Sequence, residues 1–133
     1  MDVDLYQSQK ALDNGKWALR NGGVLVLVSK CREGIGHGTF LRQLSCSHDP
    51  LAVLEGLDGE YRLGYHKAAK MAEVASWARV FAVTDLDDDL VRQAHMLPFA
   101  TVEEAVRQAL GGIPGGRVLV LTDGSMTVPK VMP

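Results

Sequence analysis

The chain has 133 residues, of which 47% are hydrophobic, and a formal net charge of -2. This length and composition fit one domain with a sizeable core and exclude a disordered chain. The small negative charge gives no basic surface for nucleic acid, and the longest apolar run, residues 24–28, is far too short to cross a bilayer. Cys31 and Cys46 are too few for a disulfide framework, and the polar N-terminus carries no signal-peptide pattern. We therefore expect a cytoplasmic protein without nucleic-acid or membrane partners.

The first part of the chain predicts a helix followed by a buried strand. In residues 5–20, leucines recur every seven positions, and Asp2 or Asp4 can serve as the N-cap. Residues 21–23, Asn-Gly-Gly, accept left-handed backbone angles and end the helix. Residues 24–29 are continuously apolar up to the final serine, which is typical of a strand buried on both faces of a parallel sheet.

The rest of the chain continues the alternation of helices and strands. A turn-rich connection is expected at residues 58–64, and Thr101 with Glu104 forms a capping box at the start of the last helix. Helices are predicted at residues 39–46, 50–57, 65–78, 87–95 and 102–110, and strands at 79–84, within 95–100, and at 117–122.

This order of elements predicts the fold class and the edge where a ligand would bind. Strands alternating with helices indicate a single α/β domain over residues 1–133, a three-layer α/β/α sandwich. Its sheet is expected to be mostly parallel and Rossmann-like, with about four strands. Ligands of such folds bind beyond the carboxyl ends of the strands, which here carry residues 31–38, 85–89 and 123–127.

Two loop regions are candidates for binding. Gly34, Gly36 and Gly38 lie between a strand and a helix, but their G-x-G-x-G spacing is not the dinucleotide fingerprint. They are either a tight turn that needs positive φ angles or a loop that holds an anion with backbone N–H groups. His66 and Lys67 open a predicted helix, either as solvated residues of its first turn or as binding groups at the ligand edge.

No metal site or catalytic constellation is predicted. Asp85, Asp87 and Asp89 match the first half of a calcium loop, but Leu90 and Met96 stand where glycine and glutamate are needed. Helix capping accounts for this acidic run. The four histidines and two cysteines show no zinc spacing, and no nucleophile elbow is present.

The first predicted helix carries a polar stripe. Gln7, Lys10, Asn14 and Trp17 follow steps of three, four and three residues, so they share one side of the helix. Amide and ammonium groups in a row suit a carboxylate or a phosphate. The alternative is an ordinary solvated helix face.

Several motifs, taken in order, resemble the C-terminal domain of the nickel-dependent lactate racemase family. The chain has a Y-Q-x-x-K-A helix, a G-G-V strand and a C-x-E-G-x-G loop, followed by GYHKAAKMAEVA, TVEEAVRQAL and VLTDGSMTVP. The resemblance covers essentially the whole chain, and the order and spacing of these motifs carry more weight than any one of them.

The resemblance implies a partner domain and a set of site residues. In this family an N-terminal domain holds a nickel-pincer nucleotide and the histidines that exchange the substrate proton, and the C-terminal domain acts as a lid. Gln7 and Lys10 match the glutamine and lysine that contact the bound groups, and Tyr65 is a possible counterpart of an aromatic site residue. No part of this chain resembles the cofactor-bearing domain, so we expect no cofactor bound by this domain alone and no catalytic residue within it.

We therefore expect the substrate-contacting C-terminal domain of a 2-hydroxy-acid racemase or epimerase, an isomerase, that is inactive on its own. The chain would be an excised domain or a stand-alone relative, with the cofactor domain and a small 2-hydroxy acid as its partners. The alternative is a non-enzymatic α/β module that binds a small anion or has a regulatory role.

Overall fold

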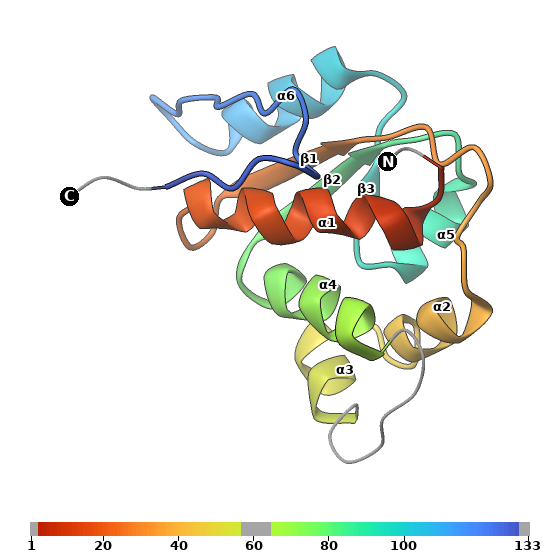
Figure 1. The fold of residues 1–133 in the computed structure, drawn as a ribbon. Coiled ribbons are helices and arrows are strands. Elements are labelled where there is room, and N and C mark those ends of the chain that lie inside the picture. Colours follow the sequence, from red (N-terminus) through yellow and green to blue (C-terminus); the bar gives the residue numbers. More distant parts are fainter. Residues whose placement is uncertain (1–2, 57–64, 131–133) are drawn as a thin grey trace.

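The centre of the molecule is a sheet of parallel strands in the order β1-β2-β3. The structure is a computed structural model that describes residues 3–56 and 65–130, and the turn-rich connection expected at residues 58–64 lies outside them. The strands are β1 (Val24–Val28), β2 (Arg79–Val83) and β3 (Leu97–Pro98). Figure 1 shows helix α6 on one side of this sheet and helices α1 and α4 on the other, with α2 and α3 beyond α4.

The predicted helices are present, and the α/β class with a parallel sheet is confirmed. The first helix ends earlier than residue 20, because the chain passes into one 3-10 turn, η1 (Lys16–Ala18), before leaving the helix. Thr101 caps α6 by accepting the Glu104 N–H, as the capping box predicts. The bounds are α1 (Leu5–Gly15), α2 (Gly38–Leu44), α3 (Pro50–Gly56), α4 (Tyr65–Trp77), α5 (Asp88–Gln93) and α6 (Val102–Gly111).

The core lies between the sheet and the layer formed by α1 and α4. Leu5 and Leu12 of α1 are fully buried there, as their seven-residue spacing predicts. Asp4 caps α1 by accepting the Gln7 N–H at 2.7 Å. A buried hydrogen bond of 2.7 Å between the hydroxyls of Ser8 and Ser29 ties α1 to the residue that follows β1. The first helix is therefore fixed against the carboxyl end of the first strand.

The prediction of a strand at residues 117–122 is wrong. Within the described part of the chain, the sheet has three strands, and no backbone hydrogen bond joins 117–122 to β1. A groove of about 1140 Å³ lies between this segment, α6 and β1. Apolar side chains consequently stay exposed, including Val120 at 73% and Val28 of β1 at 58%. A β-rich sequence forms a strand only when it pairs with a neighbour, and here the chain runs past β1 without pairing.

None of the helices in the described ranges has the length and apolar character needed to span a bilayer.

Paired alanine substitutions distinguish an unpaired segment from a fourth strand. We expect Val120→Ala to change the free energy of unfolding by less than about 0.5 kcal/mol, because its side chain is already exposed. Val80→Ala, in the central strand, should cost about 1 to 2 kcal/mol, because it removes buried methyl groups. Urea denaturation of both variants measures this, and similar losses for the two would indicate that residues 117–122 pair with the sheet in solution.

Candidate functional site

The loop that follows β1 supports the start of α1. The N–H of Leu5 donates to the carbonyl of Gly34, and the N–H of Tyr6 donates to the carbonyl of Ile35, both at 3.0 Å. These two donors belong to the first turn of the helix, which has no acceptors within the helix itself. The loop carbonyls therefore add to the Asp4 cap and hold the first turn at the carboxyl edge of the sheet.

Gly34 and Gly36 make this support possible. Their φ angles are +87° and +97°, in the left-handed region that favours glycine. At Gly36 a Cβ atom would lie 2.7 Å from the Cβ of Tyr6, so the loop approaches the helix too closely for any side chain. This geometry fits the tight-turn interpretation. Ligand binding by Gly34 and Gly36 stays a prediction.

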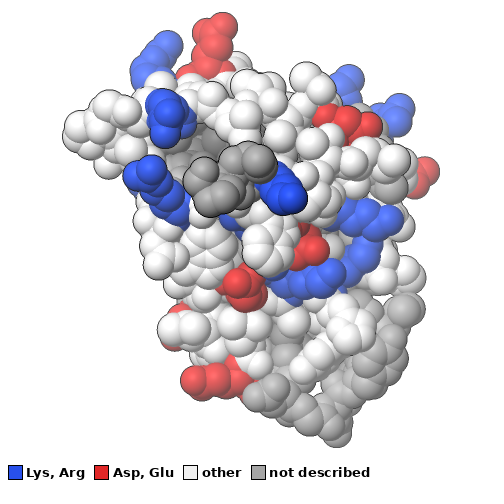
Figure 2. Space-filling view, turned by 60° about the vertical axis from the view of Figure 1, so that its left-hand side comes forward, with Lys and Arg blue, Asp and Glu red and all other residues white. Residues whose placement is uncertain are grey.

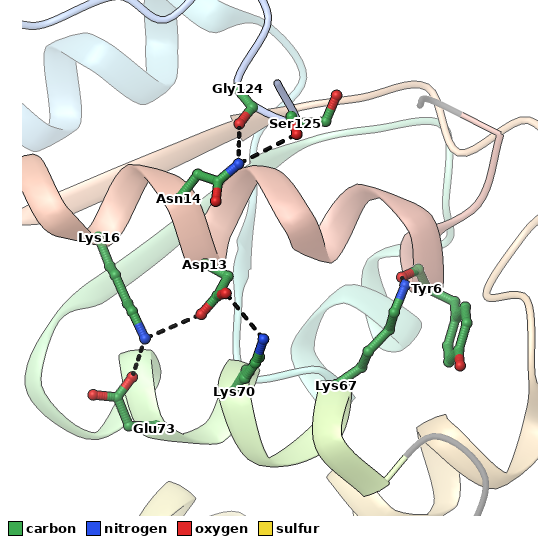
Figure 3. Close-up of polar contacts among 9 residues, drawn as sticks. All are labelled: Tyr6, Asp13, Asn14, Lys16, Lys67, Lys70, Glu73, Gly124 and Ser125. Atoms are coloured by element: carbon green, nitrogen blue, oxygen red, sulfur yellow. Dashed lines mark hydrogen bonds and ion pairs between the residues drawn. The ribbon is translucent and has the colours of Figure 1, made fainter. Parts of the chain in front are cut away.

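Tyr6 is the centre of the contacts around this first turn. Its ring meets the rings of His37 and Phe40 edge-on, at centroid distances of 4.6 and 5.5 Å. The ammonium of Lys67, on α4, lies 4.0 Å from the centroid of the Tyr6 ring and donates to the Tyr6 carbonyl at 2.7 Å. Figure 3 shows this lysine reaching across from α4 to α1. The sequence analysis assigned no role to Tyr6, although the tyrosine directly precedes Gln7 in the quoted motif.

Gln7 and Lys10 lie on an accessible side of α1. Lys10 is exposed and Gln7 is half-buried. Within the described ranges, neither side chain makes a hydrogen bond or an ion pair. Because residues three positions apart face the same way on a helix, the two groups can contact one ligand. The structure therefore leaves both predicted site residues available.

The remaining members of the polar stripe have other positions. The side-chain amide of Asn14 donates to the carbonyls of Gly124 and Ser125, at 2.9 and 3.3 Å, and so ties the end of α1 to the C-terminal segment (Figure 3). Trp17 lies in η1 and is 61% exposed. Asn14 is thus engaged in holding the fold, and Gln7 and Lys10 are the two polar members of the stripe that stay available for a ligand.

An ion-pair network joins α1 to α4 further along the helix. Asp13 lies 3.0 Å from the ammonium of Lys16 and 3.2 Å from that of Lys70, and Lys16 also lies 3.5 Å from Glu73. Burial alone would raise the pKa of Asp13, but the hydrogen bonds and charges of the two lysines together hold that pKa below its ordinary value. The pKa of Lys16 is raised because its carboxylate partners outweigh the effect of burial.

Near the first turn of α1, the lysine that contacts it from α4 is not neutralised by an ion pair among the described residues. Lys67 makes no ion pair within the described ranges, and its pKa is lowered by burial and then by the charge of Lys10, while Asp4 opposes this effect. On the face shown in Figure 2, which is the side that lies at the left of Figure 1, basic and acidic side chains are intermingled. Positive charge is therefore neutralised near Asp13 and left in excess near Tyr6.

Tyr65 and His66 begin α4, next to Lys67. Tyr65 is half-buried and packs against the core, and the ring of the exposed His66 meets it edge-on at 5.7 Å. The structure thus places both residues at the end of α4 that approaches Tyr6. Their contact with a ligand stays a prediction.

Metal binding finds no support among residues 3–56 and 65–130. These residues contain no group of three or more histidine, cysteine or carboxylate side chains arranged to hold an ion. Cys31 is buried and Cys46 is exposed, and no disulfide joins them.

Three comparisons with known proteins confirm the resemblance seen in the sequence. A family model described as the lactate racemase C-terminal domain matches residues 1–128. Lactate racemases from Thermoanaerobacterium thermosaccharolyticum and Lactiplantibacillus plantarum are each 27% identical over 136 aligned positions, which cover 98% of this chain and 32% of each relative. A solved structure of the lactate racemase apoprotein from the former organism matches with a TM-score of 0.79 and 28% identity, over 85% of this chain and 28% of that one. The chain thus spans about a third of the length of these relatives.

Alanine substitutions at Gly34 and Gly36 separate the cost of backbone strain from the cost of a steric clash. We expect Gly34→Ala to cost about 1 kcal/mol of stability, because its positive φ is unfavourable but nothing lies within 4 Å of a new Cβ. Gly36→Ala should cost about 2 to 4 kcal/mol, because the clash with Tyr6 adds to the same strain. Denaturant unfolding gives both values, and equal costs would show that the loop does not pack against α1 this closely.

The Asp13 network predicts a stability difference that depends on pH. A lowered pKa means that the ionised carboxylate stabilises the fold, so its contribution is present above the ordinary value of 3.8 and is lost as the pH falls through the lowered pKa. We expect Asp13→Asn to cost about 1 kcal/mol at neutral pH, with the difference from wild type vanishing in acid. Urea unfolding over a pH series tests this, with the exposed Asp85→Asn as control. A difference that is unchanged by pH would contradict the network.

Proposed function

The chain belongs to the lactate racemase C-terminal domain family, and on this basis we propose that it is the substrate-contacting domain of a 2-hydroxy-acid racemase or epimerase. The observation that carries the proposal is the free pair formed by Gln7 and Lys10 on the accessible side of α1. Lys16, in η1, and Lys70, on α4, are instead engaged with Asp13. An uncompensated ammonium beside an amide is suited to a small carboxylate.

The proposal includes a partner domain that carries the cofactor. The described residues do not themselves fit a nickel centre, since they contain no cluster of metal-ligating side chains. Because the relatives are about three times as long as this chain, we assign the nickel-pincer nucleotide of the family to an N-terminal domain that closes over α1. Hydride exchange at the substrate α-carbon is the chemistry that this group supplies when bound, and we expect no racemisation by the isolated 133 residues.

The residues of this chain would bind and orient the substrate. The Lys10 ammonium would form a charge-assisted hydrogen bond with the carboxylate, and the Gln7 amide would add a neutral hydrogen bond to the carboxylate or the hydroxyl. Holding the acid group at two points limits rotation of the α-carbon, which favours reaction by fixing its orientation. The fixed first turn of α1 keeps both groups in position without rearrangement.

Substitution of Lys10 tests the proposal in the protein that joins this chain to a cofactor-bearing domain. We expect Lys10→Met to lower kcat/KM for 2-hydroxy acids about 100-fold, because the carboxylate loses its charged partner while the apolar stem is kept. Arg107→Met, an exposed residue on α6 across the sheet, is the control for loss of one positive charge and should leave racemisation unchanged.

The possible outcomes separate enzymatic from non-enzymatic roles. Full activity of Lys10→Met across a panel of 2-hydroxy acids would refute its assigned role. If the wild-type protein binds lactate through Lys10 but racemises none of the panel, the alternative of an anion-binding or regulatory module is correct. Reading the gene upstream of the Met1 codon shows at once whether a cofactor domain is encoded in the same frame.

A further inference from the structure

Lys67 combines a half-buried side chain, a fixed ammonium and, among residues 3–56 and 65–130, no carboxylate partner within ion-pair distance. Its Nζ atom is held by the Tyr6 carbonyl at 2.7 Å and lies 4.0 Å from the centroid of the Tyr6 ring. Among the ion pairs between described residues, the other two lysines at the α1–α4 contact, Lys16 and Lys70, both reach Asp13. A cation on an aromatic ring and a carbonyl is well oriented, but its charge is not neutralised.

Lys10 is near enough for its charge to act on this ammonium. In an α-helix the carbonyl of Tyr6 accepts the N–H of Lys10, so Lys67 meets α1 at the carbonyl to which Lys10 is itself bonded. Side chains on a helix lean toward its N-terminus, which directs the Lys10 stem toward the turn that Lys67 contacts. Two lysines from different helices thus approach one turn of α1.

We propose that Lys67 is a second cation of the substrate site, and that Lys10 and Lys67 together hold one carboxylate beside the ring of Tyr6. This inference rests on the proposed function, because the carboxylate is that of the 2-hydroxy acid. Only one of the three N–H donors of Lys67 is needed for the Tyr6 carbonyl, so the ammonium can still donate to a bound oxygen. Lys67 also positions Tyr6, and through Tyr6 the turn that carries Gln7.

The electrostatic state of the site supports this assignment. Two positive charges near each other in a partly buried place disfavour the charged form, and the pKa of Lys67 is lowered by burial and by Lys10. Asp4 on the α1 side offsets part of this, while Lys70 on α4 adds to it. A bound carboxylate would remove the repulsion. Unfavourable charge pairs that a ligand relieves are characteristic of binding sites.

Nuclear magnetic resonance of the 133-residue chain tests the inference without requiring catalysis. The Cε resonances of labelled lysines are followed through an alkaline pH titration, with sodium L-lactate or with sodium chloride at equal ionic strength. We expect lactate to raise the titration midpoints of both Lys10 and Lys67, because an anion stabilises the ammonium form. Lys16 serves as the internal control whose midpoint should not move, since Asp13 and Glu73 already neutralise it. A shift of Lys10 alone, or of neither lysine, overturns the inference.

Kinetics of the cofactor-loaded protein separate this inference from the proposed function. Lys67→Met should raise KM for lactate about 10-fold, with a smaller effect on kcat, and Lys67→Arg should restore KM because it keeps the charge. Arg107→Met, on α6 across the sheet, is the control for loss of one positive charge and should leave KM unchanged. If Lys10→Met abolishes racemisation while Lys67→Met does not alter KM, the proposed function stands and the two-lysine site is wrong. If the wild type does not racemise but lactate shifts both lysines, the site stands and the enzymatic function is wrong.

Discussion

The packing of the first turn of α1 is the constraint on which the candidate site depends. Carbonyls of the glycine loop hold this turn from the side of β1, and the ammonium of Lys67 holds it from α4. Helix termini leave backbone groups unpaired, so a turn fixed by outside partners has a defined position that an isolated helix would lack. Gln7 and Lys10 take their direction from this turn. A small change at Gly36 or Lys67 would therefore displace both.

The contact between α1 and α4 differs in character between its two ends. Near Asp13, paired charges bind the helices to each other and leave little net charge. Near Tyr6, the helices are joined by a cation on a ring and a carbonyl, and the positive charge persists. Partly buried ion pairs hold elements together, whereas an uncompensated charge is costly unless a partner arrives. Under the proposed function, this division would let one helix pair serve both as a rigid support and as the binding site for an acid.

Local sequence patterns predict much of the fold, but they do not predict the structure of residues 117–122. The leucine spacing of α1, the cap at Asp4 and the capping box at Thr101 each act within a few residues, so the sequence predicts them directly. Val118, Leu119 and Val120 have the composition of a strand, yet a strand requires a second chain segment in register. Asn14 instead holds the carbonyls that follow this segment, and β1 remains an open edge.

For the site, the sequence is enough to predict the family, the placement of Gln7 and Lys10 on one side of a helix, and the glycines that permit a close turn. These follow from residue type and spacing along a single element. The tertiary structure alone decided that Lys67 meets Tyr6, that Asn14 serves the fold, and that Lys16 and Lys70 are neutralised. Apart from the Asp13–Lys16 pair, which is local, these contacts join groups distant in sequence, and their distances are set by how the helices pack, which no local pattern records.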